Sequence, residues 1–233
     1  MNWLTTTVSL YARVARRAAV VALSNWPVLL SLFAYVAILA IVTPIALALG
    51  IVGGFLLGFV WAACVSSFLY LVERLVRHGK VVLEDFRDSF LAYFSDVIGV
   101  MFVLWIVRLL LSMVIQTNPQ GMLIALVVEL FLFVFFNAVP ELVYLGHHSS
   151  LDLLGESYSF ISENWIEWFP PTIVAAVLLY EILGLPLYGW LPSMAKLGAA
   201  ALFVYFTMVM RGLLFSELAS STRRSRAYRE RLR

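Results

Sequence analysis

Residues 102–136 read FVLWIVRLLLSMVIQTNPQGMLIALVVELFLFVFF, and this stretch decides the fold class. Two apolar runs flank the polar turn QTNPQ, and each run approaches the length of about 20 residues that a membrane-spanning helix needs. The whole chain of 233 residues is 63% hydrophobic and only 13% charged, whereas soluble domains are about 25% charged. Its mean hydropathy is +0.95. The sequence therefore predicts an all-α integral membrane protein.

The length criterion gives six transmembrane helices, which pair into three hairpins. The turns within the hairpins carry no Lys or Arg, whereas the two ends of the chain and the segment after the second span carry most of the positive charge. The positive-inside rule then predicts that both termini are cytoplasmic. The pair Pro170-Pro171 is expected at the first turn of the fifth span, where missing N–H groups cost little. The predicted spans are 26–48, 52–73, 97–115, 121–145, 169–186 and 195–216.

A stretch with helical amphipathicity precedes each hairpin, over residues 8–21, 82–94 and 154–165. We expect each to form a cytoplasmic interfacial helix with its apolar face toward the membrane. The third of these should end near Asn164-Trp165, ahead of the fifth span. This order suggests a single membrane domain over residues 1–218 with repeats 1–75, 76–146 and 147–218, followed by a basic cytoplasmic tail, 219–233. The alternative, that any chain with paired spans looks periodic, stays open.

Arg108 and Glu129 are the two charges of the opening stretch. Each lies roughly 12–14 Å from the turn at about 1.5 Å per residue, which is near the middle of a hydrocarbon layer about 30 Å thick. A lone charge at that depth is costly, so the two are predicted to form an intramembrane ion pair. The pair either fixes the register of the two spans or serves as a proton or substrate relay.

Two further groups of residues stand out within the spans. Asn137, Glu141 and Arg211 are predicted to lie at similar cytoplasmic depth, as an inward polar cluster or as solvated helix ends, and Pro140 should loosen the fourth span. Small residues spaced four apart predict close helix packing, because they let backbones approach in lipid. These are Gly50, Gly54, Gly58, Ala62 and Ser66.

Basic residues at both ends of the chain are predicted to bind anionic lipid headgroups, which attract them near a membrane surface. This location favours membrane lipids over nucleic acid as partners. His147, His148 and Asp152 supply too few ligands to hold a metal ion. We therefore predict no metal site. The predicted headgroup-binding residues are Arg13, Arg16, Arg17, Arg223, Arg224 and Arg226.

The sequence has no P-loop, zinc-protease, nucleophile-elbow or dinucleotide-binding motif, and we predict a protein that is not an enzyme and needs no cofactor. The segments FLYLVERLVRHGKVVLEDFRDSF (68–90) and GESYSFISENWIEWFPP (155–171) resemble poorly characterised prokaryotic multi-span proteins similar to the membrane domain of glycerophosphodiester phosphodiesterases. The resemblance implies a membrane module of the prokaryotic cytoplasmic (inner) membrane, without hydrolase activity.

Two functions stay open from the sequence. The first is a scaffold, an accessory subunit of a membrane complex with a protein partner, or a protein of lipid handling. The alternative is a small transporter or channel that uses Arg108 and Glu129.

Overall fold

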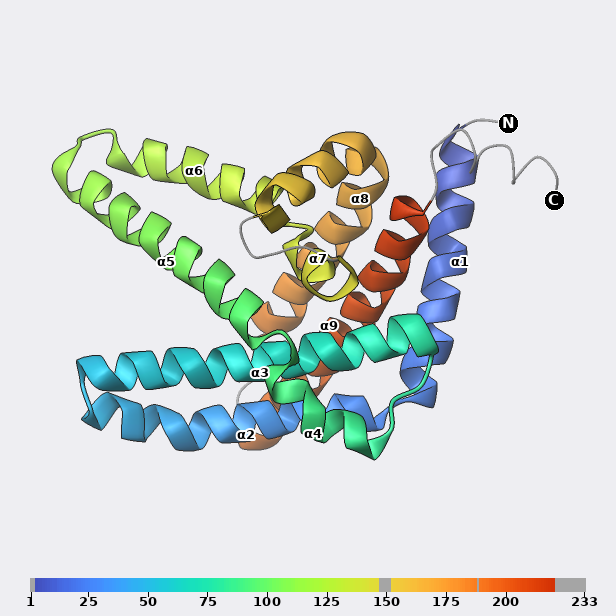
Figure 1. Ribbon diagram of the computed structural model, residues 1–233, viewed down its shortest axis with the longest axis horizontal. Helices are drawn as coiled ribbons and strands as arrows, with labels where there is room; N and C mark the ends of the chain where they lie inside the picture. The colour runs from blue at the N-terminus through green and yellow to red at the C-terminus, as the bar shows by residue number, and fades with distance from the viewer. Residues whose placement is uncertain (1–2, 147–151, 188, 221–233) are drawn as a thin grey trace. The chain divides into compact units, whose positions relative to one another are not determined.

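The computed structural model describes residues 3–146, 152–187 and 189–220, and these residues form helices and no strand (Figure 1). Six stretches of them are long and apolar enough to cross a membrane: Pro27–Ala48, Ile51–His78, Phe94–Thr117, Gly121–Leu145, Asp152–Gly184 and Trp190–Ala219. The predicted helical class and the number of spanning stretches are therefore confirmed. The helices are α1 (Trp3–Ser24), α2 (Pro27–Ala48), α3 (Ile51–His78), α4 (Leu83–Ala92), α5 (Phe94–Thr117), α6 (Gly121–Phe135), α7 (Val139–Leu145), α8 (Asp152–Gly184) and α9 (Trp190–Ala219).

The chain divides into two compact units, and each unit draws on segments that are far apart in the sequence. The first unit comprises Met1–Ala37, Leu71–Val82 and Asn164–Arg233, and the second comprises Ile38–Tyr70 and Leu83–Glu163. Helices α2, α3 and α8 each contribute residues to both units. These units do not coincide with the three successive repeats, which stay a prediction, as do the sidedness of the chain and the interfacial position of its amphipathic helices.

In the first unit, α1 packs along α9 (Figure 1). The apolar face of α1 is buried at four-residue intervals, with Leu10, Val14 and Ala18 as examples, as expected for one stripe of a helix. Near the end of α1, the Tyr205 hydroxyl of α9 lies 3.3 Å from the Ala22 carbonyl oxygen and 3.1 Å from that of Asn25. Apolar packing and a buried hydroxyl thus fix α1 against α9.

The Asn25 side chain organises the turn between α1 and α2. Its Nδ2 donates to the carbonyls of Val21 and Gly79, at 2.9 and 3.0 Å. Its Oδ1 accepts a hydrogen bond from the Val81 N–H at 3.2 Å. Gly79 has φ +72°, a conformation that favours glycine. One buried amide therefore caps the end of α1 and holds the segment that leaves α3.

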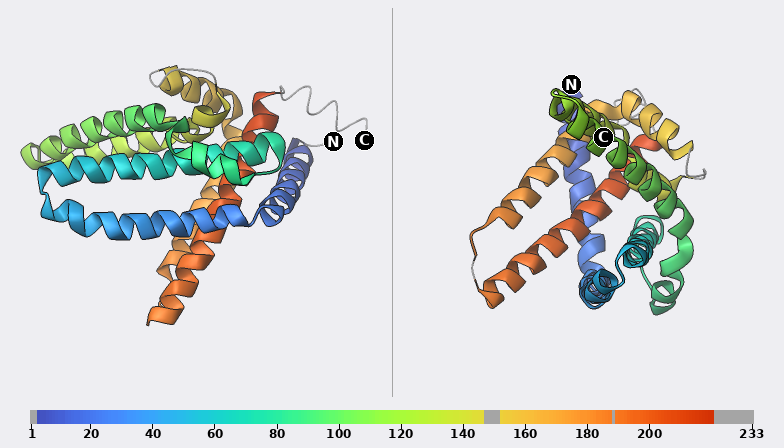
Figure 2. Two further views of the ribbon diagram at one scale, coloured as in Figure 1. Left: turned by 60° about the horizontal axis from the view of Figure 1, so that its bottom comes forward. Right: turned by 90° about the vertical axis from the view of Figure 1, so that its left-hand side faces the viewer.

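Helix α8 differs from its prediction. The sequence suggested a surface helix ending near Asn164-Trp165 and a separate span from residue 169, but α8 runs without a break from Asp152 to Gly184. A short connection then leads into α9 (Figure 2). The expected break is absent although Pro170 and Pro171 lie inside the helix.

In the second unit, α5 and α6 pack against each other on either side of a tight turn (Figure 1). Within this turn, the Asn118 side chain accepts a hydrogen bond from the Gln120 N–H at 2.9 Å. The fourth spanning stretch is interrupted after Phe135 and resumes as α7 at Val139. Pro140 has no N–H and its ring clashes with the carbonyl four residues earlier, which accounts for the break that the sequence suggested.

Candidate functional site

Two adjacent prolines sit in the middle of α8, where each residue normally donates an N–H to the carbonyl four positions back. The expectation that Pro170 and Pro171 lie in the first turn of a helix was wrong. Because Pro171 has no N–H, the Glu167 carbonyl loses its usual donor. The Tyr11 hydroxyl of α1 donates to this carbonyl instead, at 2.9 Å. The hydroxyl thus supplies a donor that α8 lacks and joins α1 to α8.

The ionisation of Tyr11 reflects its buried position and the nearby Glu167 carboxylate. Burial, and next the negative charge of Glu167, raise the pKa of Tyr11 to about 12. Both causes oppose formation of a phenolate. The hydroxyl therefore keeps its proton at neutral pH and stays a donor.

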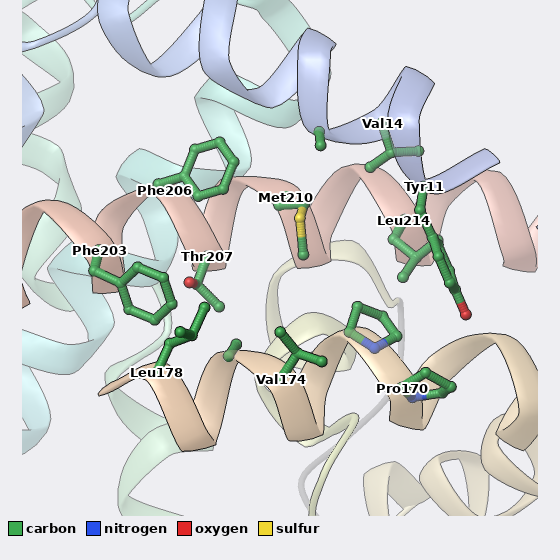
Figure 3. A pocket seen from close by; sticks show the side chains of 13 residues that line it. Tyr11, Val14, Pro170, Val174, Leu178, Phe203, Phe206, Thr207, Met210 and Leu214 are labelled. Atoms are coloured by element: carbon green, nitrogen blue, oxygen red, sulfur yellow. The ribbon is translucent and has the colours of Figure 1, made fainter. Parts of the chain in front are cut away.

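A cavity of about 340 Å³ lies among α1, α8 and α9, next to the two prolines (Figure 3). Among the lining side chains only Tyr11 and Thr207 carry a polar group. Ligand pockets in proteins start at about 300 Å³, so the cavity can take an apolar ligand. The lining residues are Tyr11, Val14 and Ala15 of α1, Pro170, Pro171, Val174, Ala175 and Leu178 of α8, and Phe203, Phe206, Thr207, Met210 and Leu214 of α9.

A second apolar cavity, of about 420 Å³, shares two lining residues with the first. Phe203 and Phe206 of α9 line both cavities. The second cavity continues along the end of α1 and the start of α2, where it includes Ala22 and the exposed Trp26. The first unit therefore presents two apolar hollows that meet at the same two phenyl rings.

Two exposed arginines follow the part of α1 that lines the first cavity. Arg16 and Arg17 come directly after Ala15, a lining residue, and both are exposed. Arg13 is held differently, because its Nη2 lies 3.5 Å from Glu217 Oε1 on α9. Of the predicted headgroup-binding residues, Arg16 and Arg17 thus remain accessible to an anionic group. Arg223, Arg224 and Arg226 lie outside the described residues.

Arg211 of α9 belongs to a compact group in the first unit. Its guanidinium carbon lies 4.8 Å from the ring centre of Trp168, a cation–π contact with a buried ring. Its Nη1 lies 3.4 Å from the Thr172 hydroxyl. Asn137 and Glu141, its predicted neighbours, belong to the second unit. Glu141 is fully buried there, and the cluster of these three residues stays a prediction.

The structure brings Arg108 and Glu129 together. Arg108 Nε on α5 lies 3.7 Å from Glu129 Oε1 on α6. The side chains are 68% and 49% exposed, so the ion pair lies on an outer face of the helix pair and not within its seam. Matching depth along the hairpin was therefore a sound basis for pairing them.

The stripe of small residues on α3 is only partly packed. Ala62 and Ser66 are fully buried. At Gly50, Gly54 and Gly58, by contrast, an added Cβ would meet no atom of the described chain within 4 Å. The close approach occurs one position away, at Gly53, where a Cβ would overlap the carbonyl oxygen of Ala46. Within this chain, the predicted stripe is therefore packed at Ala62 and Ser66, and the packing of its three glycines stays a prediction.

A metal site was considered at His147, His148 and Asp152. His147 and His148 lie outside the described residues. Within the described parts of the chain, no group of three or more His, Cys, Asp or Glu residues could hold a metal ion.

The apolar cavities were missed by the sequence analysis. Their walls come from helices that are far apart in the sequence, and Tyr11 lies 156 residues from its partner Glu167. Two signals were present, namely the apolar face of residues 8–21 and the proline pair, but neither shows which helices meet. The resemblance to the membrane domain of glycerophosphodiester phosphodiesterases stays a prediction. Comparisons of the chain with protein-family models, curated proteins and solved structures find no match.

Proposed function

We propose that the chain is a non-enzymatic multi-pass protein of the prokaryotic cytoplasmic membrane that handles lipid, by holding an acyl chain in the cavity of α1, α8 and α9. The observation that carries this proposal is the almost wholly apolar wall of a cavity in an apolar helical unit. An empty cavity deprives its lining of dispersion contacts. An acyl chain from the surrounding membrane restores these contacts and needs no polar partner.

Choice among lipids has to come from the headgroup. Acyl chains are as apolar as the cavity wall, so moving one out of the bilayer brings little hydrophobic gain. Arg16 and Arg17 are exposed directly after the α1 residues that line the cavity. Each basic residue near a membrane surface contributes about 1 kcal/mol of attraction to anionic lipid. The proposed ligand is therefore an anionic phospholipid.

Lipid handling has better support than the other functions considered. A scaffold or accessory subunit does not need an apolar ligand cavity. A transporter or channel that used Arg108 and Glu129 would place them along an enclosed path, but within one copy of the chain both side chains are exposed. The cavity of the first unit is thus the stronger basis for a function.

The test compares one substitution that fills the cavity with one that does not. Ala175 lines the cavity, whereas its neighbour Ala176 does not and is exposed. The parent, Ala175→Trp and Ala176→Trp are purified in mild detergent, and the phospholipid retained by each after washing is counted by mass spectrometry. We expect the parent and Ala176→Trp to retain lipid and Ala175→Trp to lose it. Equal retention by all three proteins would mean that the retained phospholipid is bulk lipid and not lipid bound in the cavity. That result would refute the proposal.

The headgroup part has its own test. Replacing Arg16 and Arg17 together by Gln removes about 2 kcal/mol of attraction and should reduce the enrichment of anionic over zwitterionic lipid by roughly thirtyfold. The total amount of retained lipid should change little, because the cavity is intact. An unchanged lipid ratio would show that these arginines do not select the headgroup.

A further inference from the structure

The Arg108–Glu129 pair leaves most of its hydrogen-bonding capacity unused within the hairpin. A guanidinium has five N–H donors and a carboxylate has two acceptor oxygens. The contact between Nε and Oε1, at 3.7 Å, involves one nitrogen and one oxygen. With side chains 68% and 49% exposed, the remaining donors and acceptors face outward.

Most of the exposed side chains near the pair along α5 and α6 are apolar. Trp105 and Leu109 on α5 and Leu126 and Phe133 on α6 are all exposed. In the most apolar windows of these two spanning stretches, only 6% and 11% of residues are buried. Exposed apolar side chains are ordinary in lipid, but exposed charges are not, because the hydrocarbon offers no water to pair with them.

Depth restricts what can cover the pair. If α5 and α6 span the membrane, as proposed, both charges lie roughly 12–14 Å from the turn, near the bilayer midplane. The missing partner must then present one acidic and one basic group side by side at that depth. A second copy of this chain presents both, since it carries the same two residues.

We infer that the α5–α6 face is the interface of a homodimer whose twofold axis runs along the membrane normal. Such an axis keeps every residue at its own depth and places the same patch on both sides of the interface. Arg108 of each copy then meets Glu129 of the other, and the four charges alternate in sign. The apolar side chains around the pair exclude lipid from this contact.

The test uses charge reversal in trans. Arg108→Glu makes both positions acidic, and Glu129→Arg makes both basic. Either variant alone brings like charges together across the interface, so self-association should fall at least about tenfold. A mixture of the two variants restores opposite charges at both contacts and should restore association. Association is measured by energy transfer between donor-tagged and acceptor-tagged copies in vesicles that are progressively diluted with lipid.

This design separates the dimer from other arrangements. Within each variant the two charges of one chain stay alike, so pairing within the chain cannot explain rescue by mixing. Glu181→Arg reverses an exposed charge on α8 and should leave the energy transfer unchanged. Parent protein with energy transfer no higher than random encounter would overturn the inference, as would parent-level transfer in both single variants or a mixture that fails to recover.

The energy transfer measured for the parent protein also tests the homodimer if a charge-reversal variant does not fold. In that case Arg108→Gln and Glu129→Gln serve as milder changes, and each should weaken association several-fold. A parent that is monomeric in vesicles but is purified with a different membrane protein would show a heterologous interface and overturn the homodimer.

Discussion

At the residue scale, the Tyr11 hydroxyl has the clearest structural role, because it replaces the N–H that Pro171 cannot provide to Glu167. Side-chain donors often satisfy backbone groups that a helix leaves unpaired. The contrast with Arg108 and Glu129 shows what sequence can predict at this scale. Those two are joined by one turn, so depth along the hairpin was enough to pair them. Tyr11 and Glu167 meet only after distant helices have packed.

Removing the Tyr11 hydroxyl should destabilise the first unit. Tyr11→Phe keeps the ring but leaves the Glu167 carbonyl without its donor, which costs about 1–3 kcal/mol when the group is buried. Unfolding in mixed micelles measures the change in free energy. Tyr180→Phe is the matched control, since Tyr180 is 75% exposed on α8 and should cost almost nothing. Equal losses in the two variants would contradict the proposed role of the Tyr11 hydroxyl.

The raised pKa of Tyr11 predicts a dependence of stability on alkaline pH. The pKa of Tyr11 is raised from an ordinary value near 10 to about 12 in the folded protein. The stabilisation is thus fully present below pH 10 and is lost as the pH rises from 10 through 12, because the unfolded chain ionises first. The stability difference between the parent and Tyr11→Phe should therefore shrink between pH 9 and pH 12. A difference that stays constant over this range would argue against the assignment.

At the element scale, the start of α3 shows how closely packing depends on the rotation of a helix. Gly50 has φ +59° in the turn that precedes α3, a conformation that favours glycine. Gly53 then faces Ala46, and Gly54 faces open space. A four-residue stripe predicts that small residues share a face, but it does not say which neighbour lies opposite. The close approach at Gly53, one residue away from the stripe, could therefore not be predicted from the spacing.

Alanine substitutions at these glycines should separate the two faces. Gly53→Ala places a methyl group against the Ala46 carbonyl. This overpacking should lower the free energy of unfolding by about 1–3 kcal/mol or more. Gly54→Ala and Gly58→Ala meet nothing within 4 Å and should be neutral or stabilising by up to about 1 kcal/mol through helix propensity. Thermal unfolding of the three variants in one detergent provides the comparison. The reverse order of stability would show that the glycines Gly54 and Gly58 form the tight contact.

At the scale of the whole molecule, hydropathy predicted the helical class and the six spanning stretches, because both depend on summed composition. It did not predict that α8 is continuous, since the proline pair looked like a helix start and its compensation comes from Tyr11. It also could not predict the cavity, which forms only where α1, α8 and α9 meet. Composition thus determines the helical class and the spanning stretches, and long-range contacts determine where the candidate site forms.

The orientation of the chain across the membrane is a prediction about the whole molecule, and cysteine labelling can test it. If both termini are cytoplasmic, the turn after α5 faces outward and α4 faces the cytoplasm. With the single native Cys64 replaced by Ala, a cysteine at Asn118 should react with a membrane-impermeant maleimide in intact cells. A cysteine at Glu84, which is exposed on α4, should react only after permeabilisation. The opposite pattern would invert the topology.

The most direct test of the proposed lipid site is to locate where an acyl chain contacts the protein. Vesicles are made with an anionic phospholipid that carries a photoreactive group in its acyl chain, and labelled residues are identified by mass spectrometry after illumination. We predict labelling concentrated on cavity residues such as Val174, Leu178 and Met210. Ile173 and Val177, exposed on the same helix but not among the lining residues, should be labelled much less. Equal labelling of the two groups would contradict the proposed site.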